Sequence, residues 1–474
     1  MDSINTEIVV LGAGPGGYAA AFYAADLGKK VLLVEQDKHL GGVCLNRGCI
    51  PSKALLHAAK MIVEARESAH RGITFGPPQI ELDKLRAWKN SIVEKLAGGV
   101  LFLAGKRGVQ VLTGRGYFEN SQTLRIETPQ GQQFVHFEKA IVAVGSNAAL
   151  PKVFDLGNPR VMTSTEALEV PEVPEDLLVV GGGYIGMELG GVYASLGSKV
   201  VVVEALDTIL SGADPDLVRP VFKRAQASFR ELRFKTKVTN MATKGKKILA
   251  VTEGPDKTPR EELFDRVLVS VGRVPRCRDL GLENTKVEQD ERGFIKVNDK
   301  QETADPAILA VGDIAGGVLL AHKASKEGRI AVETILGEAS TSAGVVIPAV
   351  VFTDPEVAWC GLTEGEARAK GIAVHLAKFP WAASGRALTF DHAEGLTKLI
   401  IDAETERVLG VGIVGHGAAE LIAEGVVIVE MRGSVRDLAE CVHPHPTLSE
   451  TIMEAAEAFY GHATHTFSPK KREE

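Results

Sequence analysis

Short apolar runs separated by a glycine-rich turn open the chain. The run Ile8–Leu11 is followed by the turn Gly12–Gly17, an alanine-rich helical stretch, and a second apolar run, Val31–Val34, that ends at Glu35. Continuous apolar runs of this length are typical of strands buried on both faces of a parallel sheet. The order strand, glycine turn, helix, strand and acid indicates a dinucleotide-binding βαβ unit.

Three glycines of this turn have distinct physical roles. Gly12 allows the tight turn, Gly14 lets the backbone approach a pyrophosphate, and Gly17 lets the helix and strand pack closely. The phosphates are expected at the helix N-terminus. Glu35 can accept hydrogen bonds from ribose hydroxyls. A glycine triplet alone is weak support, but this full context is strong.

The pattern occurs a second time. The run Leu177–Val180 leads into the turn Gly181–Gly186, a helix, and the strand Val200–Val203, which ends at Glu204. In both copies the acid falls 18 residues after the third glycine. The sequence therefore predicts two dinucleotide sites.

Later strands support two related units. Ala140–Ser146 resembles Val267–Arg273, since each is an apolar run that ends in Val-Gly and one further residue. The strand Pro306–Val311 delivers Asp313 at its C-terminal end, where open α/β sheets bind ligands. A helix is expected over about Ala321–Leu336. Asp313 could alternatively cap a helix.

The pattern changes from about Ala349. Alternating runs at Leu396–Ile401 and Val408–Val414 predict antiparallel strands with helices between them, and no glycine fingerprint recurs. The predicted fold class is α/β, with two Rossmann-like dinucleotide-binding domains and a C-terminal α+β domain.

Composition narrows the function classes. A chain of 474 residues with a net charge of −7 carries no nucleic-acid footprint. Its N-terminus lacks the basic and apolar regions of a signal peptide, and no apolar run could span a membrane, so we expect a cytoplasmic protein. Five cysteines are few for a secreted disulfide scaffold, and no Cys/His group has zinc-ligand spacing, so no metal is expected.

Cys44 and Cys49 lie five positions apart among glycines. In a straight helix, residues at this spacing have Cα atoms roughly 8.7 Å apart, whereas a disulfide needs less than about 7 Å. If the two are bridged, the backbone around Cys44 must leave helix geometry, which Gly41, Gly42 and Gly48 permit. The pair is either a redox-active disulfide or two buried thiols.

Near the C-terminus, His443–Glu450 reads His-Pro-His-Pro-Thr-Leu-Ser-Glu and enters a helix through Ala458. His445 and Glu450 are close enough in sequence to be a base and the group that orients it. The alternative is a proline-rich turn with surface histidines. Two dinucleotides suggest a hydride relay, and exchange between thiols and a disulfide needs a base for the thiol proton.

Taken together, these motifs identify a resemblance. With the segment Gly41–Leu56 (Gly-Gly-Val-Cys-Leu-Asn-Arg-Gly-Cys-Ile-Pro-Ser-Lys-Ala-Leu-Leu) and the doubled fingerprint, the chain resembles flavoprotein disulfide reductases over essentially its full length, most closely the dihydrolipoamide dehydrogenases. The resemblance implies FAD and NAD as cofactors and oxidation of protein-bound dihydrolipoamide to lipoamide with reduction of NAD⁺ to NADH. It also implies a homodimer that serves lipoyl domains of 2-oxo acid dehydrogenase complexes or of the glycine cleavage system.

The resemblance also assigns residues. Cys44 would exchange with substrate, Cys49 would be the thiolate against flavin, and His445 with Glu450 would act on the cysteines of the other subunit. The FAD contacts implied are Gly12, Gly14, Gly17, Glu35, Lys53, Gly116, Asp313 and Ala321, with Lys53 paired to Glu188. The NAD contacts implied are Gly181, Gly183, Gly186, Glu188, Glu204, Val238 and Gly272.

Domain bounds follow from the same resemblance. An FAD-binding domain is expected over 1–150, an NAD-binding domain over 151–275, a central segment completing the FAD domain over 276–348, and a dimerisation domain over 349–474. Arg47 stands where valine is common in the family, and its role is open.

Cofactor and substrate choice can be argued from single positions. Glu204 without a nearby arginine favours NAD over NADP. The redox motif differs from that of glutathione reductases. The absence of a cysteine after Cys441 disfavours mercuric reductases and large thioredoxin reductases.

Overall fold

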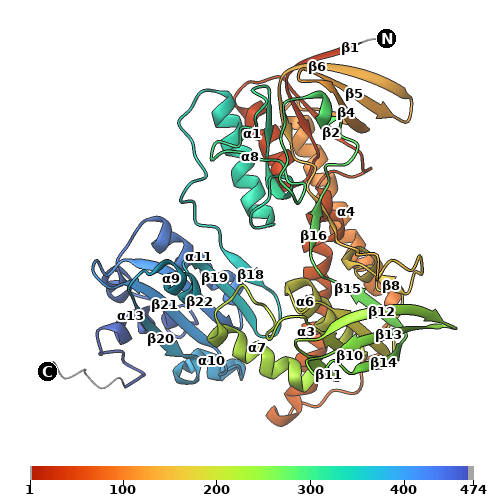
Figure 1. The fold of residues 1–474 in the computed structure, drawn as a ribbon. Coiled ribbons are helices and arrows are strands. Elements are labelled where there is room, and N and C mark those ends of the chain that lie inside the picture. Colours follow the sequence, from red (N-terminus) through yellow and green to blue (C-terminus); the bar gives the residue numbers. More distant parts are fainter. Residues whose placement is uncertain (1–2, 468–474) are drawn as a thin grey trace.

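The computed structural model describes residues 3–467 and arranges them around sheets of seven, five, three, two and five strands (Figure 1). The N-terminal sheet lies at one end of the molecule. The second dinucleotide unit and the C-terminal sheet lie next to each other at the opposite end (Figure 1). Within residues 3–467, no helix is both long and apolar enough to cross a membrane.

The N-terminal sheet has the order β3-β2-β1-β6-β5-β4, and β17 pairs with β6. Its core strands are parallel, with Val10 opposite both Leu33 and Ile141, whereas β4, β5 and β6 form an antiparallel meander. Helices α1 and α8 pack together beside this sheet (Figure 1). The strands are β1 (Ser3–Leu11), β2 (Val31–Glu35), β3 (Gln110–Thr113), β4 (Arg115–Asn120), β5 (Thr123–Thr128), β6 (Gly131–Val142) and β17 (Ile308–Ala310). The helices are α1 (Pro15–Asp26), α2 (Gly42–Arg47), α3 (Cys49–Glu67), α4 (Leu82–Lys106) and α8 (Ala321–Ile335), with 3-10 turns η1 (Ser68–Arg71), η2 (Leu282–Asn284) and η3 (Gly312–Ala315).

The second unit repeats the parallel βαβ arrangement. Its five-stranded sheet has the order β11-β10-β9-β15-β8, and a three-stranded antiparallel sheet, β12-β13-β14, packs beside it. A two-stranded ribbon of β7 and β16 connects this unit to the first. The strands are β7 (Ser146–Ala148), β8 (Val161–Met162), β9 (Asp176–Val180), β10 (Lys199–Val203), β11 (Glu231–Arg233), β12 (Lys237–Lys244), β13 (Lys247–Glu253), β14 (Pro259–Phe264), β15 (Arg266–Val269) and β16 (Arg273–Pro275). The helices are α5 (Ser164–Ala167), α6 (Tyr184–Leu196) and α7 (Pro215–Ser228).

The C-terminal sheet is antiparallel and has the order β18-β19-β22-β21-β20. The strands are β18 (Ala349–Val351), β19 (Glu356–Gly361), β20 (Val374–Pro380), β21 (Leu396–Asp402) and β22 (Val408–Gly415). The helices are α9 (Glu364–Lys370), α10 (Gly385–Phe390), α11 (Ala418–Glu430), α12 (Val435–Glu440) and α13 (Glu450–Phe459), with the 3-10 turn η4 (Trp381–Ala383). The predicted α/β fold class, with two dinucleotide-binding units and a C-terminal α+β unit, is confirmed. The exact domain bounds stay a prediction, and the central segment returns to the first sheet through β17.

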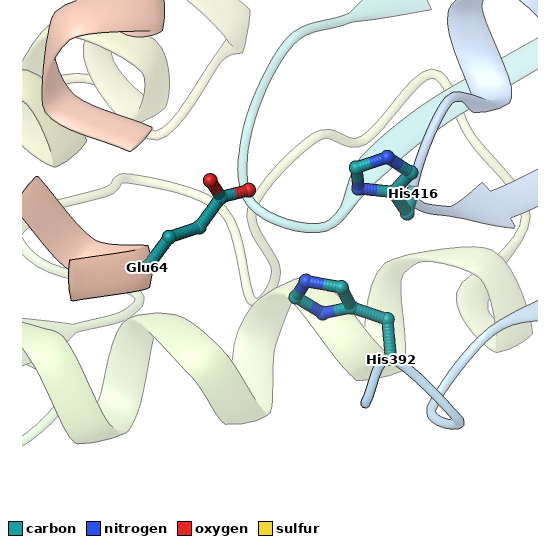
Figure 2. A group of neighbouring side chains, drawn as sticks. All are labelled: Glu64, His392 and His416. Atoms are coloured by element: carbon teal, nitrogen blue, oxygen red, sulfur yellow. The ribbon is translucent and has the colours of Figure 1, made fainter. Parts of the chain in front are cut away.

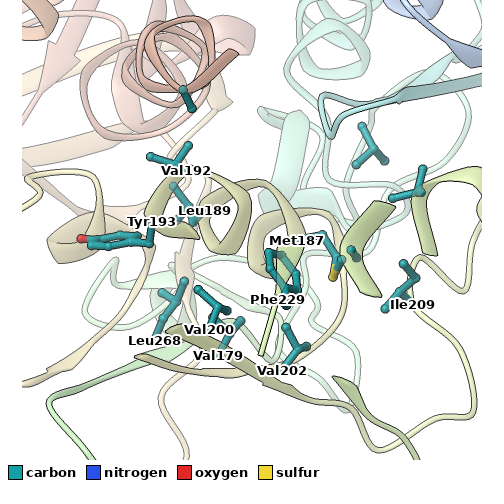
Figure 3. Packing of buried hydrophobic residues seen from close by; sticks show 14 of the residues in the cluster. Val179, Met187, Leu189, Val192, Tyr193, Val200, Val202, Ile209, Phe229 and Leu268 are labelled. Carbon is teal, nitrogen blue, oxygen red and sulfur yellow. The ribbon is translucent and has the colours of Figure 1, made fainter. Parts of the chain in front are cut away.

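One apolar core connects helix α3 with both neighbouring sheets. Leu55 of α3 lies in a cluster with Val179, Met187 and Tyr193 of the second unit, and with Val414 of the C-terminal sheet. Figure 3 shows the α6 side chains of this cluster packed between the second sheet and the neighbouring helices. Since burying a large apolar side chain is worth about 1.5–3 kcal/mol, this shared core holds α3 rigidly against both units.

Candidate active site

The first glycine turn has the close contacts that the sequence predicted. Gly12 has a φ of +100°, and a Cβ at this position would lie 2.6 Å from the carbonyl oxygen of Ala143. A Cβ on Gly17 would lie 1.8 Å from the carbonyl oxygen of Gly12. Glu35 is buried and accepts hydrogen bonds from the N–H groups of Ala13 at 2.8 Å and Asp37 at 3.0 Å. Each carboxylate oxygen keeps a lone pair for a ribose hydroxyl.

The second turn has the same geometry. Gly181 has a φ of +105°, and a Cβ there would lie 2.5 Å from the carbonyl oxygen of Ser270. A Cβ on Gly186 would lie 2.0 Å from the carbonyl oxygen of Gly181. Glu204 accepts hydrogen bonds from the N–H groups of Gly182 at 2.6 Å and Leu206 at 2.7 Å.

Both turns end in a helix N-terminus suited to a pyrophosphate. Gly14 is the N-cap of α1 and Gly183 is the N-cap of α6, and neither helix has an acidic residue in its first turn. The backbone N–H groups and the helix dipole at such an end favour an anion. The residues of both turns therefore fit a dinucleotide.

A cavity of about 1710 Å³ opens beside the first turn and reaches the cysteines. Ordinary ligand pockets measure about 300–1,000 Å³, so this one is large enough for a dinucleotide. Seven of the eight residues predicted for FAD line it, while Gly17 packs beneath the turn. These seven are Gly12, Gly14, Glu35, Lys53, Gly116, Asp313 and Ala321.

Five of the residues predicted for NAD belong to the second βαβ unit, namely Gly181, Gly183, Gly186, Glu188 and Glu204, and Glu188, on α6, also lines the large cavity. Val238 lies on β12 of the three-stranded sheet. The side chain of Val238 is buried among Val180 and Val203, so any contact with a dinucleotide falls to its backbone. Gly272 follows β15 with a φ of +129° and accepts a hydrogen bond from the Ala149 N–H at 2.9 Å. Asp207, three residues after Glu204, pairs with Lys235, whose Nζ lies 3.9 Å from the carboxylate.

The two cysteines lie on different helices. Cys44 belongs to α2 and Cys49 begins α3, because Gly48 between them has φ −148° and ψ −110° and ends the helix. The break in helix geometry therefore lies at Gly48, one of the three glycines expected to permit it. Both cysteines line the large cavity, and both are thiols in this structure.

The two thiols differ strongly in acidity. A hydrogen bond from the Cys44 thiol lowers the pKa of Cys49 to about 7 against the opposing effect of burial, and the Lys53 ammonium acts in the same direction. That hydrogen bond, together with burial, raises the pKa of Cys44. The reduced pair therefore holds its negative charge on Cys49.

Lys53 forms the ion pair that the sequence predicted. Its Nζ lies 2.9 Å from Glu188 Oε2, and the Glu188 side chain is only 4% exposed. Glu188 Oε1 accepts a hydrogen bond from the N–H of Phe352 at 2.9 Å. The Phe352 ring also lies 4.3 Å from the Lys53 ammonium. The C-terminal unit thus helps to fix the charge beside Cys49, a contribution with no sequence signal.

Arg47, whose role the sequence left open, forms an ion pair with Asp37 after β2. The side chains of both residues are about one-third exposed. The charge that favours the Cys49 thiolate comes from Lys53. Arg47 therefore connects α2, the helix that carries Cys44, to the end of β2 through this ion pair.

Asp313 is held by two residues that the sequence analysis did not assign. The Ser146 hydroxyl donates to Asp313 Oδ2, and Arg273 Nε donates to that hydroxyl at 2.7 Å. Arg273 Nε itself lies 3.6 Å from the Asp313 carboxylate. The signal for both residues was present, since they end the two similar strands Ala140–Ser146 and Val267–Arg273.

His445 and Glu450 meet as predicted, but away from the cysteines. His445 Nδ1 lies 2.8 Å from Glu450 Oε1, and Glu450 Oε2 accepts the Thr447 N–H at 2.7 Å. Burial opposes ionisation of Glu450, but the bonds from Thr447 and His445 lower its pKa overall. The His445 side chain is 72% exposed and is not among the residues lining the cavity that holds Cys44 and Cys49.

Comparison with known proteins covers nearly the whole chain. Residues 6–328 match the family model described as pyridine nucleotide-disulphide oxidoreductase, and residues 347–456 match its dimerisation domain. Dihydrolipoyl dehydrogenases of Vibrio cholerae and Vibrio parahaemolyticus are 46% and 47% identical over 461 residues, covering 97% of this chain and 97% of each relative. The solved structure of LpdA from Mycobacterium tuberculosis superposes with a TM-score of 0.89 at 27% identity, covering 96% of this chain and 99% of that one.

Proposed function

Because the chain belongs to the pyridine nucleotide-disulphide oxidoreductase family, we propose that it is a dihydrolipoyl dehydrogenase that oxidises protein-bound dihydrolipoamide and reduces NAD⁺ to NADH. The observation that carries the proposal is the pair of unequal thiols, Cys44 and Cys49, at the wall of a dinucleotide-sized cavity. When bound, FAD supplies an acceptor for the two electrons held on this pair, and NAD⁺ carries them away as a hydride.

The difference in acidity decides which sulfur the substrate attacks. In thiol–disulfide exchange the thiol of lower pKa is the better leaving group. A dihydrolipoyl thiolate therefore attacks the Cys44 sulfur, the Cys44–Cys49 bond breaks, and its electron pair leaves on Cys49. The second dihydrolipoyl thiolate then attacks the substrate sulfur of the mixed disulfide and releases Cys44. Lipoamide leaves with its S–S bond closed, and the cysteines hold its two electrons.

Two protons leave the substrate, and the chain has a place for each. One ends on the Cys44 thiol, whose pKa is raised. The other goes to His445, which is oriented through Nδ1 by Glu450 and so presents Nε2 as the acceptor. Lys53 keeps the remaining charge on Cys49, and Glu188 holds Lys53 in place.

We assign His445 to the cysteine pair of a second copy of the chain. In its own chain it is exposed and lies outside the cysteine cavity, and it lies within the region, residues 347–456, that matches a dimerisation domain. The proposed assembly is a homodimer whose two sites each take a base from the partner. Its substrates would be lipoyl domains of 2-oxo acid dehydrogenase complexes or of the glycine cleavage system, in the cytoplasm.

NAD is the proposed nicotinamide cofactor. A carboxylate at Glu204 would repel the 2′-phosphate of NADP, and it is fixed in place by two backbone N–H groups. Lys235 lies near Asp207, which neutralises its charge in part.

Purified holoenzyme tests the function directly. We expect bound FAD and rapid NADH formation at 340 nm from dihydrolipoamide, with NADP⁺ a poor substitute. Cys44→Ser should remove this activity while leaving the bound FAD in place. A chain without FAD, or a Cys44→Ser enzyme that still oxidises dihydrolipoamide, would refute the proposal. If the enzyme instead prefers glutathione with NADPH, it is a reductase of another disulfide and not a dihydrolipoyl dehydrogenase.

A further inference from the structure

Glu64, His392 and His416 form a compact cluster away from the redox site (Figure 2). Glu64 lies in the last turn of α3, His392 follows α10, and His416 follows β22. One ligand atom of each residue lies within 4.8 Å of those of the other two. The three come from distant parts of the sequence, so no local spacing could have predicted them.

The three side chains lie against one another. Figure 2 shows the Glu64 carboxylate directed at the two imidazoles, and the rings are stacked with centroids 5.3 Å apart. His392 Nδ1 lies 3.6 Å from the Glu394 carboxylate, which leaves Nε2 for the cluster. A carboxylate on the outer nitrogen is the usual support of a histidine that binds a metal.

The cluster already accommodates a positive charge. The Lys60 ammonium lies 3.0 Å from His416 Nδ1. A neighbouring pocket of about 320 Å³ is lined by Lys60, His416, Asp354 and Glu356, so carboxylates face the same space and water has access. The surroundings therefore favour a cation and leave room for its further ligands.

We propose that Glu64, His392 and His416 bind a divalent transition-metal ion of the zinc class, which displaces the Lys60 ammonium from His416. Two imidazoles and one carboxylate are a common zinc ligand set, and a water from the pocket completes a tetrahedron. Ligand atoms around tetrahedral zinc lie roughly 3.4 Å apart. The Glu64 side chain is exposed and can rotate toward the ion, and the two imidazoles would have to turn about their side-chain bonds to direct their nitrogens at it.

Such a site would join the far end of the redox helix to the C-terminal unit. Helix α3 carries Cys49 at its first residue and Glu64 near its last turn. A metal bound only in the folded state stabilises that state in proportion to the logarithm of its concentration. We therefore expect zinc to raise the thermal midpoint of the enzyme.

The test is a zinc titration of the oxidised holoenzyme by isothermal calorimetry, in which the closed Cys44–Cys49 bridge keeps the redox thiols from binding zinc. Wild type is compared with His392→Ala, with the milder exposed change Glu64→Gln, and with Lys60→Met. The control is His136→Ala, which alters an exposed histidine bonded to Thr123 on the first sheet. Bound FAD and dihydrolipoamide oxidation confirm that each variant is folded.

We expect one zinc site per chain in wild type and in the His136→Ala control. Loss of a ligand should weaken this site by at least about tenfold in His392→Ala and Glu64→Gln. Removing the competing charge in Lys60→Met should tighten it by at least about fivefold. Equal affinity in wild type and His392→Ala would overturn the proposal. So would zinc binding that appears only in Lys60→Met, since Lys60 would then block the site.

Discussion

The acidity of Cys49 provides the sharpest test of the site because its main cause is a single hydrogen bond from Cys44. Cys44→Ala removes that donor, whereas Cys44→Ser keeps a hydroxyl at the same position. Neither variant can form the disulfide, so both report on Cys49 without turnover. Lys53 is present in both, so its effect cancels in the comparison.

The expected size follows from the energy of the lost bond. A hydrogen bond to a charged group is worth about 1.5–3 kcal/mol, and one pKa unit corresponds to about 1.36 kcal/mol. The pKa of Cys49 is about 7 with the donor in place, and it should rise by about one to two pH units in Cys44→Ala. At pH 7 the thiolate fraction would then fall from about half to between roughly one and ten per cent.

Iodoacetamide alkylation measures this fraction, because the thiolate is the reactive form. Rates are taken from pH 5 to pH 10, and peptide mapping separates Cys49 from Cys277, Cys360 and Cys441. The Cys44→Ser enzyme should titrate near 7 and the Cys44→Ala enzyme near 8 to 9. Coincident midpoints for the two variants would show that the donor does not set the acidity of Cys49.

Three further outcomes check other parts of the site. His445→Ala should lower kcat for dihydrolipoamide oxidation by about 10²–10⁴, the usual worth of a general base, and His136→Ala, measured beside it, should leave kcat unchanged. Arg47→Met should leave the alkylation midpoint of Cys49 unchanged. It should lower the free energy of unfolding in urea by at most about 1 kcal/mol, because the ion pair with Asp37 is partly exposed. A shifted midpoint would show that Arg47 does stabilise the Cys49 thiolate. Gly181→Ala should raise KM for NAD⁺ by at least about tenfold while FAD stays bound, because the new Cβ would lie 2.5 Å from a backbone oxygen. An unchanged KM would show that NAD⁺ binds elsewhere.

The parts of the site that the sequence predicted are those set by local backbone geometry. At Gly12 and Gly181 a positive φ and a contact below 3 Å exclude any side chain, so the residue type alone reveals the turn. Glu35 and Glu204 follow their glycine turns at the same sequence distance, because one helix separates the two strands of a βαβ unit. The same locality explains why the pair His445 and Glu450, five residues apart, could be read from the chain.

The parts that the sequence missed depend on contacts between distant segments. The N–H of Phe352 donates to Glu188, 164 residues away in the sequence, and no local motif around either residue predicts this hydrogen bond. Arg47 could be placed near the cysteines, but its partner Asp37 is fixed only once α2 packs against the end of β2. The break between the cysteines lies at Gly48 because both flanking segments are helical, a choice that spacing leaves undetermined.

These separate contacts meet at helix α3, where together they stabilise the Cys49 thiolate. Its first residue, Cys49, needs a stable negative charge, and Lys53 one turn later supplies the opposing charge. Lys53 can do so only if its own position is fixed, and the buried Glu188 fixes it from α6. Glu188 is in turn held by a backbone N–H of the C-terminal unit, the unit that also carries His445, the base that we propose for the second subunit. Movement of that unit relative to α3 would therefore alter the acidity of one cysteine pair and the position of the base that we propose for the other.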